Sequence, residues 1–210
     1  MHADTPFRLV LALLAVPMLS TAAYYRVRAA RAGDKLDRRQ EGIPILVSLR
    51  LSGLAFWIAM VSWLVHPPSI EWSRLDLPAG LRWIGAPLLA IAFLWMVWVM
   101  KTLGHNLTDT VVTRARATLV TAGPYRWVRN PLYSALIPVG LAVCLLAASW
   151  FFAPVMLLAF LPLVIRTRKE EANLIARFGD DYRSYMATTG RFLPKPARRG
   201  GRGAACVFTI

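Results

Sequence analysis

The sequence predicts an all-α membrane protein of about five transmembrane helices. We expect the last two to form a tight hairpin and a C-terminal amphipathic helix to follow on the cytoplasmic side. The chain of 210 residues is 57% hydrophobic with a mean hydropathy of +0.47, which is too apolar for an ordinary soluble domain. Its apolar residues form long runs, and its Lys and Arg residues gather in the gaps between them.

The apolar runs give the expected spans, because about 20 apolar residues cross a bilayer core of about 30 Å as a helix. The runs cover residues 9–25, 45–65, 81–100, 132–148 and 150–165. The first run could instead be a secretory signal, since small residues follow Ser20. The strongly basic flank after it favours a retained span. Almost nothing separates the last two runs, which are slightly short, so they predict a hairpin.

The chain becomes polar at Arg166. Apolar residues recur at helical spacing over residues 169–185, which predicts an amphipathic helix. Residues 190–203 are rich in Pro, Gly and Arg and predict a disordered tail. The expected organisation is therefore an N-terminal group of helices over 1–103, a functional half over 104–194 and a basic tail over 195–210.

The distribution of cations predicts the orientation. The gaps after the first and third runs and the C-terminal segment are basic, whereas the N-terminus, the loop at Pro67 and the hairpin tip are not. The positive-inside rule then places the N-terminus outside and the C-terminus in the cytoplasm of a multi-pass protein, such as one of a bacterial inner membrane. The net charge of +14 suits contact with anionic membrane lipids rather than nucleic acid.

A turn-rich, basic segment over residues 119–133, LVTAGPYRWVRNPLY, lies between two apolar runs. Its density of turns, aromatic rings and cations predicts half of an active site at the membrane surface. The other half is predicted at residues 166–171, RTRKEE. Both segments flank the hairpin on the cytoplasmic side, so we expect them to be neighbours in space.

Each charged or aromatic candidate has two interpretations. Glu170 and Glu171 are either a solvated pair at a helix start or acceptors for ribose hydroxyls of a nucleotide-like ligand. Arg166 lies on the same helical face as Glu170 and is either a cationic flank of a span or a contact for an anionic substrate head. Tyr125, Trp127 and Tyr133 either stack on an adenine or a sulfonium cation or sit at the interface. His2, His66 and His105 lack metal-ligand spacing, so no metal is predicted.

The order and spacing of these pieces resemble the isoprenylcysteine carboxyl methyltransferase family of integral membrane methyltransferases, with the phospholipid methyltransferases close behind. The similar part is about residues 104–194. Its pieces are Thr118-Leu119-Val120-Thr121, Gly123-Pro124-Tyr125, Arg129-Asn130-Pro131-Leu132-Tyr133, Arg166, Glu170-Glu171, Phe178-Gly179 and Tyr182. The resemblance implies S-adenosylmethionine as the methyl donor, bound at the cytoplasmic face, and a lipophilic acceptor, such as an isoprenoid or lipid carboxylate, that enters from the bilayer.

The resemblance also implies the site residues. The cofactor pocket would be lined by Thr110, Ala117, Thr118, Leu119, Val120, Tyr125, Asn130, Pro131, Leu132, Tyr133 and Glu170, and Arg166 would contact the acceptor. The chain departs from the family at two positions, since Asn130 replaces the usual His and Ala117 a frequent one. Asn can donate and accept hydrogen bonds, but it cannot titrate near neutral pH.

The resemblance implies direct in-line methyl transfer, because the sulfonium of the donor is already activated and the protein must mainly position donor and nucleophile. The sequence shows no Ser-His-Asp or Cys-His arrangement for covalent catalysis. Two other functions are compatible with the sequence. A steroid-reductase-like NADPH enzyme of the membrane also carries an R-x-P-x-Y turn in its C-terminal half. A non-catalytic membrane scaffold of the same fold would be consistent with Asn130 and Ala117.

Overall fold

The computed structural model describes residues 4–31, 43–103 and 118–196. Thr110, Ala117 and the tail from residue 197 lie outside these ranges. The regular elements are α1 (Thr5–Arg31), α2 (Ile43–Val65), η2 (Pro67–Ser73), α3 (Ala79–Trp83), α4 (Gly85–Leu103), η4 (Gly123–Arg126), α5 (Pro131–Ser134), α6 (Leu136–Ala147) and α7 (Phe152–Thr188). Every regular element of the described part is helical, as the sequence predicts.

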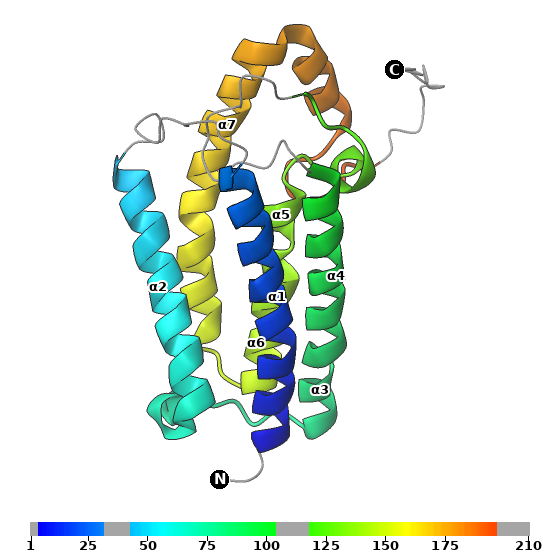
Figure 1. Cartoon of the computed structure of the whole chain (residues 1–210). Helices are drawn as coiled ribbons and strands as arrows, with labels where there is room; N and C mark the ends of the chain where they lie inside the picture. Colours follow the sequence, from blue (N-terminus) through cyan, green and yellow to red (C-terminus); the bar gives the residue numbers. More distant parts are fainter. Residues whose placement is uncertain (1–3, 32–42, 104–117, 197–210) are drawn as a thin grey trace.

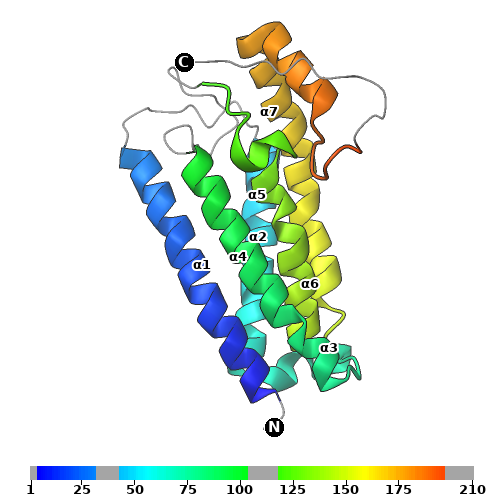
Figure 2. The same ribbon diagram turned by 90° about the vertical axis from the view of Figure 1, so that its right-hand side faces the viewer.

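The long helices form an elongated bundle (Figure 1). α1, α2, α4, α6 and the first part of α7 lie side by side, and the direction of the chain alternates from each to the next (Figures 1 and 2). α4 packs against α6, and α2 packs against α7. A Cβ atom on Gly85 would lie 2.8 Å from the Ala142 carbonyl oxygen, so glycine permits the close approach of α4 to α6. Small residues serve the same purpose at many membrane helix interfaces.

Within the described residues, three helices are long and apolar enough to cross a membrane, namely Thr5–Arg28, Val47–Val65 and Ala79–Leu103. Residues Pro131–Ala147 form a shorter apolar helix. The outer surface of these helices is itself apolar: Leu13, Ile91 and Leu94 are 73%, 63% and 66% exposed. Such a surface suits lipid rather than water. The chain therefore has the helices of an integral membrane protein, while the fourth and fifth spans stay predictions.

The structure does not separate the predicted fifth span from the predicted amphipathic helix, because both lie in the single helix α7. α7 runs without a break from the apolar run into the polar segment, and its only non-helical residue is Gly179, with φ 56° and ψ −125°. Glycine reaches this conformation without steric cost. The polar residues of 166–178 are thus a rigid continuation of the helix that packs on α2, and the chain bends at Gly179 instead.

One end of the bundle, which we call the N-terminal end, is closed by contacts among Asp4, Ser73, Arg82 and Ser149. The turn between α6 and α7 pairs with the residues after η2, since the Trp150 amide donates to the Ser73 carbonyl at 3.1 Å and the two serine hydroxyls lie 2.7 Å apart. Arg82 binds Asp4 at 2.7 Å. The Arg82 guanidinium also donates to the Leu146 carbonyl at 2.7 Å. These bonds fix the α6–α7 turn at the same level as the end of α2.

Candidate active site

The two polar segments meet at the other end of the bundle, which we call the polar end (Figure 1). The segment before α5 turns at Gly123, whose φ of 58° and close approach to Thr102 both require glycine. Asn130 then has φ −124° and ψ 62°, outside the α region that a following proline disfavours. Pro131 occupies the first turn of α5, where a missing amide hydrogen is tolerated.

Glu170 joins the two segments. Its Oε1 accepts a hydrogen bond from the Tyr133 hydroxyl at 3.1 Å and one from the Arg166 Nε at 2.9 Å. The carboxylate is 20% exposed and the Arg166 side chain 12%. A carboxylate held in this way keeps its negative charge in a poorly solvated position, because hydrogen bonds to the charged form favour it. We call Glu170, Tyr133, Arg166 and Tyr125 the Glu170 cluster.

Tyr125 belongs to this cluster because its phenol interacts electrostatically with the Glu170 carboxylate. Burial is the main cause that raises the pKa of its phenol, and the neighbouring Tyr185 and Glu170 raise it further. The Tyr185 hydroxyl donates to the Tyr125 carbonyl at 2.6 Å, which ties η4 to the last part of α7. The Tyr125 phenol is therefore neutral at physiological pH and can act as a hydrogen-bond donor.

Glu171 faces different partners. Its carboxylate, 5% exposed, binds Arg129 at 2.9 Å and also pairs with Arg191. Arg129 in turn donates to the carbonyls of Met186 and Thr189. One buried carboxylate thus holds two guanidinium groups from two paired segments, which offsets part of the cost of burying Glu171 and Arg129. We call Glu171, Arg129 and Arg191 the Glu171 cluster.

Residues 189–194, the C-terminal segment, return to the polar end and pair with the motif. Val128 and Gly190 form a parallel bridge. The amides of Arg129 and Asn130 donate to the carbonyls of Gly190 and Arg191, at 2.8 and 3.0 Å. The prediction of a disordered tail from residue 190 is therefore wrong for residues 190–194. Composition alone suggested disorder, whereas the chain here satisfies its backbone by pairing with the segment before α5.

Asn130 and Ser134 add side-chain bonds to the C-terminal segment. The Asn130 Nδ2 donates to the Arg191 carbonyl at 3.3 Å, and the Ser134 hydroxyl donates to the Phe192 carbonyl at 2.6 Å. The described contact of the Asn130 side chain is thus with this segment. An amide suits this contact, because its NH2 group is a hydrogen-bond donor at any pH.

Trp127 packs with two tryptophans of α4. Its ring stacks on Trp95 at 6.0 Å and meets Trp98 edge-on at 5.5 Å between centroids. The Trp95 indole donates to the Pro131 carbonyl at 2.9 Å. Of the two interpretations of Trp127, packing is the one that these contacts favour. The three rings anchor η4 and α5 to α4.

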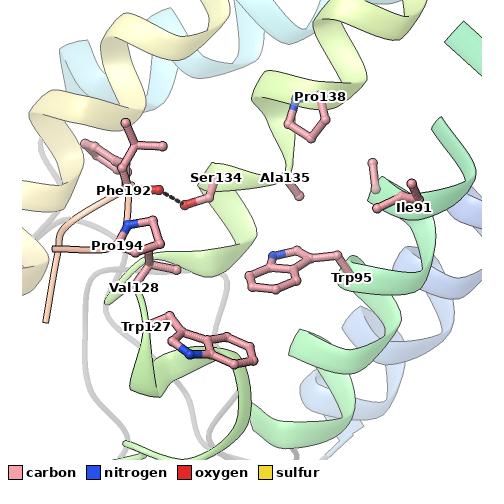
Figure 3. Close-up of a pocket in the computed structure, with 11 residues that line it drawn as sticks. Ile91, Trp95, Trp127, Val128, Ser134, Ala135, Pro138, Phe192 and Pro194 are labelled. Carbon is pink, nitrogen blue, oxygen red and sulfur yellow. Dashed lines mark hydrogen bonds between the residues drawn. The ribbon is translucent and has the colours of Figure 1, made fainter. Parts of the chain in front are cut away.

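An apolar pocket of about 460 Å³ lies between α4, α5, α6 and the C-terminal segment (Figure 3). Its lining consists of Ile91, Ala92, Trp95, Trp127, Val128, Ser134, Ala135, Pro138, Phe192, Leu193 and Pro194. Ser134 is the single lining residue with a hydroxyl group. The volume is in the range of small-molecule sites.

The structure brings Tyr125, Tyr133, Arg166 and Glu170 together. Thr118, Leu119 and Val120 lie at the start of the described segment that leads into η4. Pro131 is buried, and Leu132 packs against methionines of α4. Among the described residues, no three His, Cys, Asp or Glu side chains gather as a metal site would need.

Sequence reasoning missed the Glu171 cluster and the C-terminal segment. Arg129 entered the sequence analysis only as part of the basic segment and of the resemblance, and Arg191 lay in the stretch predicted to be disordered. One signal was available for Arg129 and Glu171: they lie in the two segments that the sequence predicted to be neighbours, and a carboxylate beside several arginines tends to pair. The pocket had no such signal, because its lining residues come from three separate parts of the chain.

Comparison with known proteins gives two findings. Residues 83–176 match the model of the isoprenylcysteine carboxyl methyltransferase (ICMT) family. A solved structure of the eukaryotic intramembrane Ras methyltransferase ICMT, without a monobody, is similar with a TM-score of 0.49 and 20% identity. That similarity covers 69% of this chain and 51% of the other, so the chain spans about half the length of that protein. A search of curated proteins finds no match.

Proposed function

Since residues 83–176 of the chain are ICMT-like, we propose that it is an integral membrane methyltransferase. In this proposal S-adenosylmethionine is the methyl donor and a lipophilic molecule with an anionic head is the acceptor, at the cytoplasmic face. The catalytic half is residues 104–194, which the helices of residues 1–103 hold in the membrane. The observation that carries the proposal is the Glu170 cluster, which lies within the ICMT-like region.

The residues of this cluster fit the donor chemically. Glu170 is a half-buried carboxylate, which can accept hydrogen bonds from ribose hydroxyls or an amino group. Its negative charge also attracts a sulfonium cation, and so do the aromatic faces of Tyr125 and Tyr133. The low solvent exposure around Glu170 strengthens this attraction, because water screens it less.

The proposed reaction needs positioning more than acid–base chemistry. Bound S-adenosylmethionine supplies a methyl group that is already activated by the positive sulfur. The acceptor's carboxylate oxygen bonds to the methyl carbon while the carbon–sulfur bond breaks, and the electron pair stays on sulfur. Opposite charges disappear in this step, so a site that excludes water favours it. No proton has to move.

Arg166 supports an anionic acceptor. Its Nε donates to Glu170, so its guanidinium lies beside the group proposed to hold the donor. A guanidinium matches the planar geometry of a carboxylate and stays charged at any physiological pH. Arg166 would therefore hold the acceptor's head within reach of the donor's methyl group, which is the main requirement for transfer.

The test is calorimetric binding of S-adenosylmethionine to the purified chain in detergent, with NADPH as the comparison ligand. We expect binding of the methyl donor and none of NADPH. Glu170→Gln should weaken donor binding by roughly 10- to 100-fold, because hydrogen bonds to a charged group contribute about 1.5–3 kcal/mol. The matched control is Glu71→Gln, which removes an exposed carboxylate at the N-terminal end and should leave donor affinity unchanged.

Near-normal donor affinity of Glu170→Gln would contradict the pocket assignment. Binding of NADPH instead of the methyl donor would support a reductase, and binding of neither would support a scaffold. Transfer of labelled methyl groups to an isoprenylcysteine analogue then tests the acceptor. Arg166→Ala should weaken the acceptor more than the donor, and an equal loss of both would contradict its role.

A further inference from the structure

The last part of α7 turns back toward the bundle at a single residue. In Figures 1 and 2 the orange end of α7 bends at the top of the helix and descends again. The bend lies at Gly179, the one residue of α7 with a non-helical backbone. A Cβ atom there would meet nothing within 4 Å, so packing does not hold this conformation in place. A change in the backbone of one unpacked residue can therefore swing the chain that follows it.

The chain after the bend is tied to itself. The Lys195 ammonium donates to the Met186 carbonyl near the end of α7, at 2.7 Å. A Cβ atom on Gly190 would collide with the Leu193 carbonyl group, so the chain between these bonds makes a tight turn that needs glycine. Residues 180–195 therefore keep their shape together, and we call them the strap.

The strap lies against the Glu170 cluster through two tyrosines. Tyr182 is 2% exposed. Burial raises the pKa of its phenol most, and the carboxylates of Glu171 and Glu170 raise it further, so the ring stands close to both. The Tyr185 hydroxyl donates to the Tyr125 carbonyl at 2.6 Å. The strap thus covers one side of the cluster that is proposed to bind the donor.

Mostly polar contacts hold the strap in place. Neither apolar core of the described bundle includes a strap residue. Phe192 packs on Phe160 at 5.4 Å between ring centroids, whereas the side chains of Arg129, Asn130 and Ser134 all donate to carbonyl groups of the strap. Polar groups can exchange such partners for water, which apolar surface cannot do. The strap therefore belongs to the parts of the molecule that cost least to open.

Glu171 is the centre of these polar contacts. It lies on α7 before the bend and binds Arg191 of the strap. It also binds Arg129, which donates to the strap carbonyls of Met186 and Thr189. If Glu171 lost its charge, the two guanidinium groups would face each other in a poorly solvated place, and opening the strap would relieve this repulsion. The charge of Glu171 therefore favours the closed strap.

We propose that the strap gates the donor site: it turns on Gly179, Glu171 latches it shut, and it opens to admit and release S-adenosylmethionine. This inference rests on the proposed function, because the enclosed ligand is that reaction's donor. The closed strap excludes water from a step in which opposite charges disappear. The two adjacent glutamates then have different roles: Glu170 binds the donor, and Glu171 is a positioning residue that acts through the strap.

The first experiment measures the position of the strap without any ligand. One spin label is placed at Ser184→Cys, an exposed position of the strap, and one at Val65→Cys, an exposed position at the end of α2. The chain also carries Cys144→Ala and Cys206→Ala, so that only the labelled cysteines remain. Pulsed electron resonance gives the distance distribution between the labels, and we expect one main distance when the strap residues and Glu171 are unchanged.

Two variants should open the strap by different routes. Glu171→Gln removes the charge of the latch, and Gly179→Ala strains the bent backbone, because a residue with a side chain rarely adopts a φ of 56°. Each should lower the ratio of closed to open strap by roughly tenfold or more, seen as a second population at longer distance. Arg191→Gln repeats the test at a side chain that is 35% exposed. Gly53→Ala is the matched control, since its Cβ also has open space but its backbone is helical.

The second experiment measures how fast the donor enters and leaves the full chain in detergent, by stopped flow with S-adenosylmethionine. A gate slows both entry and exit, so Glu171→Gln and Gly179→Ala should raise the association and dissociation rates together, each by roughly tenfold. A residue that only contacts the donor would change the dissociation rate and leave association near normal. Gly53→Ala should change neither rate.

The outcomes separate the two proposals. An unchanged distance distribution in Glu171→Gln, Gly179→Ala and Arg191→Gln would overturn the latch and the hinge. An opened strap with an unchanged association rate would overturn its role as the gate. Failure of the proposed function is a different result, because the strap would then open in the variants as expected while the unmodified chain binds no S-adenosylmethionine, which would overturn the donor as the enclosed ligand.

Discussion

Both ends of the bundle hold a buried arginine against a carboxylate, and only one of them has the features of a site. At the N-terminal end, Arg82 binds Asp4, with side chains 6% and 16% exposed. The guanidinium also lies 3.8 Å over the Phe7 ring. At the polar end, Glu170 and Glu171 bind arginines with similar geometry and similar burial. A buried ion pair by itself therefore does not distinguish structure from function.

The surroundings of the pairs make the difference. The Arg82–Asp4 pair holds the N-terminal end of the bundle together. It ties the start of α1 to α3, and Arg82 also binds the end of α6 through the Leu146 carbonyl. The Glu170 pair instead stands among phenols next to an apolar pocket, within the region that matches the ICMT family. That region begins at residue 83, immediately after Arg82. The comparison teaches that a carboxylate becomes a candidate when it adjoins a cavity and further hydrogen-bonding groups.

The largest expected difference between the two ends is one of sidedness. Trp150 lies at the turn between α6 and α7, whose backbone pairs with Ser73 beyond the end of α2, whereas Asp180 is exposed at the polar end. We expect Trp150→Cys and Asp180→Cys to react with a membrane-impermeant maleimide from opposite sides of a vesicle. Both variants are made in a chain that also carries Cys144→Ala and Cys206→Ala, so that each has a single cysteine. Labelling of both from one side would mean that the α6–α7 pair does not cross the bilayer.

The next effect is on stability, and it belongs to the N-terminal end. Asp4→Ala removes the partner of Arg82 and leaves a buried charge unpaired, which costs about 3–5 kcal/mol. We expect a large fall in the unfolding temperature in detergent, with donor affinity unchanged at temperatures where the protein is folded. Asp180→Ala breaks an exposed pair with Arg183 and should change stability by less than about 1 kcal/mol.

A smaller effect distinguishes the ends by ligand binding. Tyr133→Phe removes the hydroxyl that orients Glu170, and we expect donor affinity to fall by about tenfold with little change in stability. Ser149→Ala removes a buried hydroxyl of the N-terminal end, where it lies 2.7 Å from Ser73. That variant should cost about 1 kcal/mol of stability and leave the donor affinity unchanged. Equal effects of both on donor binding would mean that the two ends are not functionally distinct.

How much of the fold and of the site the sequence predicts depends on the kind of signal that each part of the chain carries. Long apolar runs are local, so the helices and their membrane character could be read directly. Charge in the gaps is a sum over many residues, so it correctly brought 119–133 and 166–171 to one end. Hydropathy placed the end of the last span at Arg166, whereas the helix continues past that residue and its backbone bends only at Gly179.

The contacts within the site were harder to predict. Which of two adjacent glutamates faces Tyr133 depends on the rotation of α7, and a rotation of about 100° between neighbours exchanges their partners. The return of residues 189–194 depends on backbone pairing with Arg129 and Asn130, which has no signature in composition. The Glu170 assignment to the donor stays a prediction.

The smallest expected effect concerns high pH and the polar end alone. Burial is the main cause that raises the pKa of Tyr182, and Glu171 adds to it while Arg129 opposes it. The unfolded phenol titrates near pH 10. Below that pH both states are protonated and stability is independent of this group. As the pH rises above 10, the unfolded state loses its proton first, so stability falls by up to about 1.4 kcal/mol per pH unit until the folded phenol also titrates. Tyr182→Phe should remove this group's share of the slope, while Tyr125 and Tyr185, whose pKa values burial also raises, keep theirs. Tyr24→Phe, an exposed ring of α1, is the comparison. Unfolding temperatures at pH 8 and 10.5 measure this slope.

Pulsed electron resonance between spin labels at Leu193→Cys and Val65→Cys, in a chain with Cys144→Ala and Cys206→Ala, gives a distance distribution. If this distribution broadens at pH 10.5, the polar end is the part that opens first. If Tyr182→Phe unfolds with the same alkaline slope as the unmodified chain, the loss originates elsewhere, and the polar end is no more sensitive to base than the N-terminal end.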